Sequence, residues 1–195
     1  MRIFAALAFL LLTALPAAAQ DNKVAIRLIA DRDGVEAGES VTIGIEQTIA
    51  PHWHTYWVNP GDSGSAPRID WTLPEGFTAG EIQWPVPKKL PFGPMVNFGY
   101  EDRAVLLQEI SVPENFDNGP ATLKAAIDIL VCNEICIPET HNVELTLNSD
   151  SGGSRSAIAQ ARAALPIEMG WEAKMAAREG TLVTTIAADD QVGIG

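Results

Sequence analysis

Residues 123–131 read LKAAIDILV, and within them Leu123, Ala125, Ile127 and Ile129 place an apolar side chain at every second position. Side chains of an extended strand point alternately to its two faces, so this alternation predicts a strand that buries one face in a core. The fold is therefore expected to contain sheets that are packed on one side.

Segments of the same kind recur along the chain, separated by turn-forming residues. The other strand candidates are 24–28, 41–45, 54–58, 69–73, 105–110 and 143–147. Pro and Gly clusters mark turns between them, and the run from Trp84 to Pro94 is expected to be a loop. No amphipathic helices alternate with these strands, which disfavours a parallel α/β sheet and the thioredoxin fold. The sequence thus predicts an all-β, antiparallel sandwich.

The N-terminus has the pattern of an export signal. Arg2 gives it a basic start, residues 3–15 form an apolar run, and three alanines at 17–19 form a small-residue cleavage site. The apolar run is shorter than the roughly 20 residues that a membrane span needs. We therefore expect residues 1–19 to be a signal peptide that is removed on export.

The composition changes at Asn148. A polar, glycine-containing linker follows, and Arg155 to Leu165 then predicts a short alanine-rich helix. Two strand candidates lie beyond it, too few for a stable unit of their own. We expect a β domain at 20–148, a linker and short helix at 149–165, and the incomplete start of a second β domain at 166–195. The chain would then be the front part of a longer protein.

The charge of the chain bears on its partners. The formal net charge is -12 at pH 7, whereas nucleic acids and anionic lipids attract clustered Lys and Arg. We expect no nucleic-acid partner, and the sequence points to no resident cofactor.

The two cysteines, Cys132 and Cys136, lie where the strand candidate 123–131 ends, with three residues between them. An even cysteine count in an exported chain favours an oxidisable pair. A hairpin loop from Asn133 to Ile135 would place both cysteines on facing strand ends, where α-carbons can lie about 4.5 to 5.5 Å apart and a disulfide can form. A bond that closes a five-residue loop contributes only roughly 2 kcal/mol of stability, which makes this a poor position for a purely structural cross-link.

Three functions are open for this pair. A redox pair would exchange disulfides with a partner, and a structural bridge would only stabilise the fold. A copper site would combine the thiolates with His52, His54 or His141. Glu134 and Glu139 flank the cysteines and disfavour a thiolate, which predicts thiols that react slowly until a partner docks.

Several segments in one order resemble the N-terminal domains of the DsbD/ScsB family of thiol:disulfide interchange proteins. They are HWHTYWVNPGDSG at 52–64, IDWTLPEGF at 69–77, IQWP at 82–85 and LVCNEICIPE at 130–139. The resemblance covers roughly residues 21–147, and motifs in a shared order are far more specific than the cysteine spacing alone. The spacing of three residues between the cysteines resembles that of the ScsB-like branch of the family, which is linked to copper tolerance. Another branch has five residues between its cysteines.

The resemblance implies an immunoglobulin-like β-sandwich in the periplasm. It also implies that this domain receives electrons from a membrane-embedded redox domain of the same polypeptide and hands them to oxidised thioredoxin-like periplasmic proteins. Carried over by position, Cys136 would form the mixed disulfide with a partner and Cys132 would resolve it.

The family covers its cysteines with an aromatic loop, and Phe92, Phe98 and Tyr100 lie in the corresponding place. Any of the three could form this cap, and any could instead be a core aromatic. Within the first motif, Pro60-Gly61-Asp62 is expected to be a turn held by Asp62 rather than a site.

Overall fold

The computed structural model describes residues 22–147, 154–167, 172–178 and 180–187. The expected signal peptide at 1–19 lies outside the described residues. The strands of the main body are β1 (Val24–Ala30), β2 (Ser40–Ile49), β3 (Thr55–Gly61), β4 (Arg68–Thr72), β5 (Thr78–Gln83), β6 (Lys88–Phe92), β7 (Met95–Tyr100), β8 (Arg103–Ser111), β9 (Ala121–Cys132) and β10 (Cys136–Leu147). They are followed by helix α1 (Arg155–Ala163) and by β11 (Glu172–Arg178) and β12 (Thr181–Ala187).

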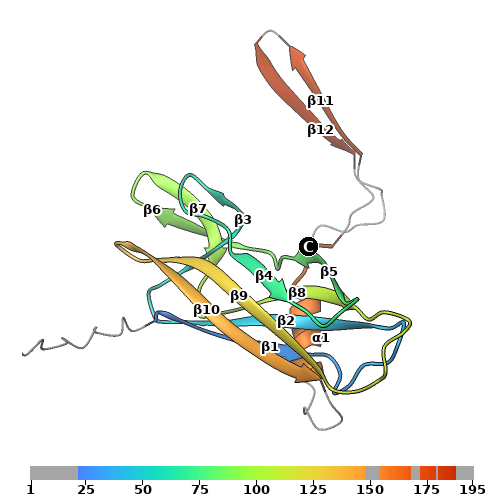
Figure 1. The fold of residues 1–195 in the computed structure, drawn as a ribbon. Helices are drawn as coiled ribbons and strands as arrows, with labels where there is room; N and C mark the ends of the chain where they lie inside the picture. The colour runs from blue at the N-terminus through green and yellow to red at the C-terminus, as the bar shows by residue number, and fades with distance from the viewer. Residues whose placement is uncertain (1–21, 148–153, 168–171, 179, 188–195) are drawn as a thin grey trace, which may run out of the picture.

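Two antiparallel sheets enclose the core of the main body (Figure 1). One sheet has the strand order β1-β2-β8-β5 and the other the order β10-β9-β4. Ile43, Ile45 and Leu106 of the first sheet and Leu123 and Ile127 of the second are each 0% exposed and belong to one apolar cluster. The expected all-β, immunoglobulin-like antiparallel sandwich is confirmed.

Strand β9 shows how the sequence pattern produces this core. Its alternating apolar residues, from Leu123 to Ile129, are buried, whereas Lys124 and Asp128 between them are exposed. Strand β10 lies antiparallel beside β9 along its whole length, from Leu147 opposite Ala121 to Cys136 opposite Cys132. The long hairpin therefore carries the cysteine pair at one end of the sandwich.

A third antiparallel sheet, of order β3-β7-β6, lies at the same end as the cysteine hairpin (Figure 1). Its strand β6 corrects the expectation that the run from Trp84 to Pro94 is a loop, because residues 88–92 pair with β7 and place Pro91 opposite Val96. Strand β6 is at the edge of its sheet, where a residue without a backbone N–H is tolerated. The loop prediction, which relied on proline content alone, was therefore wrong for this edge strand.

Helix α1 covers the outer face of the first sheet. Ile158 is 1% exposed and packs with Ile29, Val105 and Leu107 in a second apolar cluster. Gly44 leaves room for it, since a β-carbon there would lie 2.7 Å from Ile158 Cδ1. Because β2 is covered on both faces, its burial is nearly continuous instead of alternating.

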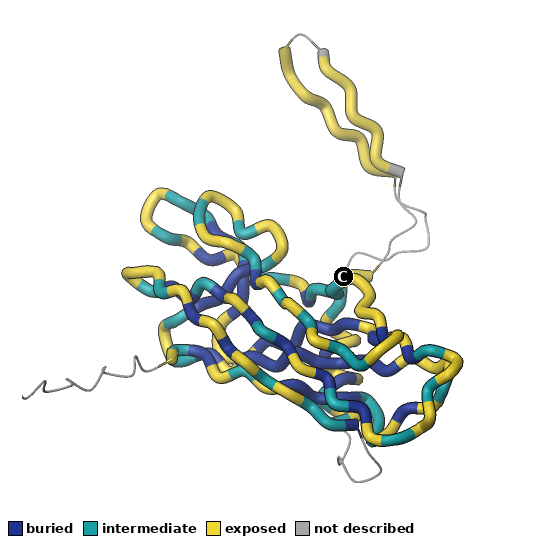
Figure 2. Tube along the Cα trace, viewed as in Figure 1, coloured by how far each residue is buried: buried dark blue, intermediate teal, exposed yellow. Residues whose placement is uncertain are grey.

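The β11–β12 hairpin exposes its side chains to solvent wherever they are described (Figure 2). Its apolar residues include Met175, Leu182 and Ile186, which are 71%, 68% and 59% exposed. A second β domain beginning here stays a prediction. Within the described ranges, no helix has the length and apolar character needed to span a membrane.

Candidate functional site

The cysteine pair joins the facing ends of β9 and β10. Cys132 and Cys136 are register partners and form a disulfide, with their α-carbons 4.1 Å apart. On its other side, Cys132 exchanges both backbone hydrogen bonds with His54, at 3.0 and 2.9 Å. Because Cys132 uses both of its backbone groups on His54, it forms a non-hydrogen-bonded pair with Cys136 on the opposite side. In antiparallel sheets the α-carbons of such pairs lie closer together than those of hydrogen-bonded pairs. The expected facing pair is confirmed, with α-carbons slightly closer than expected.

The two cysteines differ in exposure. Cys132 is 0% exposed, whereas Cys136 is an exposed residue. Between them, Asn133 donates its backbone N–H to the carbonyl oxygen of Ile135 at 3.0 Å and so closes the turn. Cys136 is therefore the member of the pair that faces solvent.

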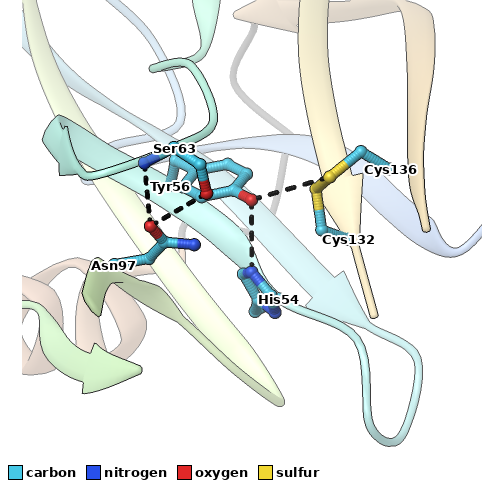
Figure 3. The surroundings of a disulfide bond; sticks show 6 residues. All are labelled: His54, Tyr56, Ser63, Asn97, Cys132 and Cys136. Atoms are coloured by element: carbon cyan, nitrogen blue, oxygen red, sulfur yellow. Dashed lines mark hydrogen bonds between the residues drawn. A yellow bond between two sulfur atoms is a disulfide. The ribbon is translucent and has the colours of Figure 1, made fainter. Parts of the chain in front are cut away.

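The hydroxyl of Tyr56 lies between His54 and Cys136 (Figure 3). It is 3.3 Å from His54 Nε2 and 3.8 Å from Cys136 Sγ. The rings of His54 and Tyr56 meet edge to face, with centroids 5.2 Å apart. His54 directly precedes β3 and Tyr56 is its second residue, so the two are two positions apart on extended chain and point to the same side. This brings a tyrosine and a histidine to the disulfide.

The loop after β3 holds the Tyr56 ring in place. A β-carbon at Gly64 would lie 2.2 Å from the ring, and Gly64 has a φ of +92°, so this close passage requires glycine. The backbone N–H and the hydroxyl of Ser63 both donate to Asn97 Oδ1, at 3.0 and 3.1 Å (Figure 3). Tyr56 is 1% exposed as a result.

The turn at Asp62 supports this loop. Asp62 donates its N–H to the carbonyl oxygen of Val96 at 3.0 Å, and Asp62 Oδ2 accepts the N–H of Val96 at 2.8 Å. Pro60 and Gly61 are the last residues of β3, so the turn begins later than the expected 60–62, and Asp62 holds it by pairing with Val96 of β7.

Burial sets the ionisation of the two residues beside the disulfide. It lowers the pKa of His54 below the ordinary value of 6.5, and the negative charge of Glu101 only partly offsets this effect. It raises the pKa of Tyr56 above 10.0, with a smaller opposing contribution from a hydrogen bond to Ser63. At neutral pH the histidine is therefore uncharged and the tyrosine keeps its proton.

The three aromatic residues expected near the cysteines occupy different environments. Phe92 on β6 and Phe98 on β7 are half-buried. Tyr100 belongs to the main core at 5% exposure and donates its hydroxyl to the carbonyl oxygen of Pro85 at 2.9 Å. Burial also raises the pKa of Tyr100. A cap over the cysteines stays a prediction.

The family model for the N-terminal region of the thiol:disulfide interchange protein DsbD matches residues 25–148. The chain belongs to this family. The crystal structure of the N-terminal periplasmic domain of ScsB from Proteus mirabilis has a TM-score of 0.66 and 23% identity, covering 90% of this chain and 68% of that one. It shows that the two share a fold.

A second solved structure is the reduced N-terminal domain of DsbD from Neisseria meningitidis. It has a TM-score of 0.36 and 13% identity, and the match covers 63% of this chain and 85% of that one. No curated protein sequence matches the chain.

Of the three histidines considered for copper, His54 lies beside the disulfide of this DsbD-family domain, whereas the other two have different surroundings. His52 is exposed in the turn before β3, and His141 is hydrogen-bonded through Nε2 to Glu139 Oε2 at 3.0 Å. In the part of the chain that the structure describes, no group of three or more His, Cys, Asp or Glu side chains is placed to hold a metal ion.

Sequence reasoning missed Tyr56 as a neighbour of the disulfide. A usable signal was present, because His54 and Tyr56 have the two-residue spacing of one strand face inside the DsbD-like motif at 52–64. What no local pattern could show is that His54 pairs with Cys132, a residue far along the chain.

Proposed function

We propose that this chain is a periplasmic thiol:disulfide interchange domain that passes electrons through Cys132 and Cys136. Its electron donor is a membrane-embedded redox domain, expected in the same polypeptide, and its acceptors are oxidised thioredoxin-like proteins. One observation carries the proposal: a disulfide between facing strand ends, with one cysteine exposed and the other buried. Membership of the DsbD N-terminal family supports the exchange chemistry.

The reaction needs two successive attacks by sulfur. The Cys136 thiolate attacks one sulfur of the partner's disulfide, which forms a mixed disulfide and releases one partner thiolate. Cys132 then loses its proton and attacks Cys136 Sγ, which re-forms the disulfide of the domain and releases the second partner thiolate. Two electrons and two protons pass from the domain to its partner.

The geometry suits this division of roles. Cys136 is exposed, so it can reach a sulfur of another protein. Cys132 is buried and fixed by two backbone hydrogen bonds to His54, so it stays close to Cys136 while the mixed disulfide exists. Ile135, 65% exposed in the turn beside Cys136, supplies an apolar contact for a docking partner.

Trapping the mixed disulfide tests the proposal. Cys132→Ser removes the resolving thiol, so we expect this variant, expressed in a periplasm, to retain thioredoxin-like proteins through a bond that reductant breaks. Cys136→Ser is the matched control, because its remaining cysteine is buried and should capture nothing. Equal capture by both variants, or by neither, would contradict the assignment.

A purified system separates exchange from the two alternatives. The reduced domain should transfer electrons to an oxidised thioredoxin-like protein in the presence of a metal chelator. Loss of transfer with chelator would favour the copper function, and full periplasmic redox function in the double Cys→Ser variant would favour a structural bridge.

The organisation of the rest of the chain is part of the proposal. The exchange domain would span 20–148, the linker and short helix 149–165, and the start of a second β domain 166–195. The solvent-exposed apolar side chains of β11 and β12 support a second unit, because a lone hairpin is marginal in water.

A further inference from the structure

We propose that Tyr56 and His54 form a proton path to Cys136, in which Tyr56 exchanges a proton directly with the sulfur and His54 acts through Tyr56. The inference rests on the proposed function, because the path matters only if Cys136 exchanges disulfides. The atoms follow one another in space: His54 Nε2 is 3.3 Å from the Tyr56 hydroxyl, which is 3.8 Å from Cys136 Sγ (Figure 3).

The chemistry creates a need for such a path. Only the thiolate of Cys136 attacks a disulfide, so the thiol must first lose its proton. Glu134, exposed in the adjacent turn, adds negative charge that disfavours the thiolate. A neutral acceptor within reach of the sulfur removes the proton without adding another negative charge.

Tyr56 is held where a proton carrier is required. Its ring lies against Gly64 and is 1% exposed, so its hydroxyl contacts the sulfur and the imidazole from a fixed position. A phenol is a weak base by itself, and burial raises the pKa of Tyr56 further. It therefore works as a relay, accepting one proton from sulfur as it gives up another to the next group.

His54 is the group that receives this second proton. Burial lowers the pKa of His54, so at neutral pH its imidazole is uncharged and Nε2 can accept, with the ring proton on Nδ1. The charged group that raises the pKa of His54 is Glu101, which follows β7 and is itself paired with Lys88 of β6 at 3.2 Å. From β9 and β10, the titratable groups at this site are Cys132 and Cys136, once reduced.

Two coupled proton transfers produce the Cys136 thiolate. Cys136 passes its thiol proton to the Tyr56 oxygen while the Tyr56 hydroxyl proton moves to His54 Nε2. This leaves a thiolate, a neutral tyrosine and an imidazolium, which later releases its proton to solvent. When the upstream donor reduces the domain, the Cys136 thiolate leaves the mixed disulfide and takes a proton from Tyr56, and Tyr56 takes one from His54 Nε2 after solvent has protonated the imidazole.

The pH profile of Cys136 alkylation tests the path without any partner protein. In the Cys132→Ser background, the iodoacetamide rate should rise in two steps between about pH 5 and pH 10. Below the pH at which the His54 imidazolium loses its proton, both His54 and Cys136 are protonated. Above it, the two groups share one proton, and the fraction held by His54 leaves a thiolate, which produces the lower step.

Three variants in this background assign the lower step. His54→Gln should abolish it, and Tyr56→Phe should abolish it although the imidazole remains, because the connection is cut. Each should slow alkylation at neutral pH by about tenfold, as expected for loss of a hydrogen bond to a charged group. His52→Asn is the matched control and should leave the profile unchanged, since His52 is exposed and has a φ of 70°, which asparagine tolerates.

A profile with one step in the Cys132→Ser background, or a lower step that survives Tyr56→Phe, would overturn the path. Thermal melting checks that the variants are folded, and His54→Asn replaces His54→Gln should the latter unfold. Partner trapping and alkylation are independent readouts. An intact two-step profile with no trapped partner would overturn the proposed function alone, whereas trapping with a one-step profile would overturn only the proton path.

Discussion

Cys132 and Cys136 show how two residues of one type on one hairpin acquire different chemistry. Cys132 is 0% exposed and hydrogen-bonded through its backbone to His54, whereas Cys136 is exposed. We expect Cys132 in the Cys136→Ser variant to react with iodoacetamide about a hundredfold more slowly than Cys136 in Cys132→Ser, if its exposure requires a local opening of about 3 kcal/mol. Mass spectrometry of native samples measures both rates, and equal rates would contradict the asymmetry. In concentrated urea the two should converge.

Glu139 is a second residue whose environment decides its role. Glu139 is 8% exposed, and its carboxylate accepts the backbone N–H groups of Lys23 and Val24, at 2.6 and 3.3 Å, and contacts His141 Nε2 at 3.0 Å. Glu139→Ala should cost about 2 to 3 kcal/mol, because these donors lose their partner in a buried place. Urea denaturation measures the change.

The control for Glu139 is on the same strand. Glu144 is exposed and paired with Lys124 at 3.7 Å, so Glu144→Ala should change the free energy of unfolding by less than about 1 kcal/mol. Similar losses in the two variants would mean that Glu139 does not hold the start of β1.

At the scale of elements, we expect helix α1 to contribute to the free energy of unfolding of the sandwich. Ile158 is 1% exposed against β1 and β8, so Ile158→Ala should lower the free energy of unfolding by about 2 to 4 kcal/mol. Ile167→Ala is the matched control, since Ile167 is 81% exposed and should contribute almost nothing. The urea midpoint gives both values, and an unchanged midpoint for Ile158→Ala would show that the helix does not stabilise the sandwich.

For the whole molecule, the fold should not depend on its disulfide. The bond closes a short hairpin, with a sequence separation of 4, so the loop-entropy model assigns it only roughly 2 kcal/mol. Neither cysteine belongs to the apolar cluster that joins the two main sheets. The double Cys→Ser variant should therefore stay folded and melt about 4 to 8 °C lower. Calorimetry measures the shift, and an unfolded double variant would make the bond a structural requirement.

Much of the fold could be predicted because short-range sequence patterns determine its strands and turns. The alternation in 123–131 predicted β9, since a strand with one buried face needs apolar residues two apart. The spacing of Cys132 and Cys136 predicted a facing pair, because a three-residue loop returns the chain upon itself. Strand β6 was missed because the prolines in and around it are typical of loops, and only its edge position makes Pro91 acceptable.

The sequence by itself determined the class of fold, the cysteine hairpin and, through several motifs in order, the family. Only the tertiary structure decided that Tyr56 and His54 lie at Cys136, that Cys132 is the buried member of the pair, and that Tyr100 belongs to the core. The physical reason is the separation along the chain over which each kind of interaction acts. Periodicity and turn chemistry act between residues a few positions apart, whereas the pairing of His54 with Cys132 joins distant segments, and only the packing of whole sheets determines such contacts.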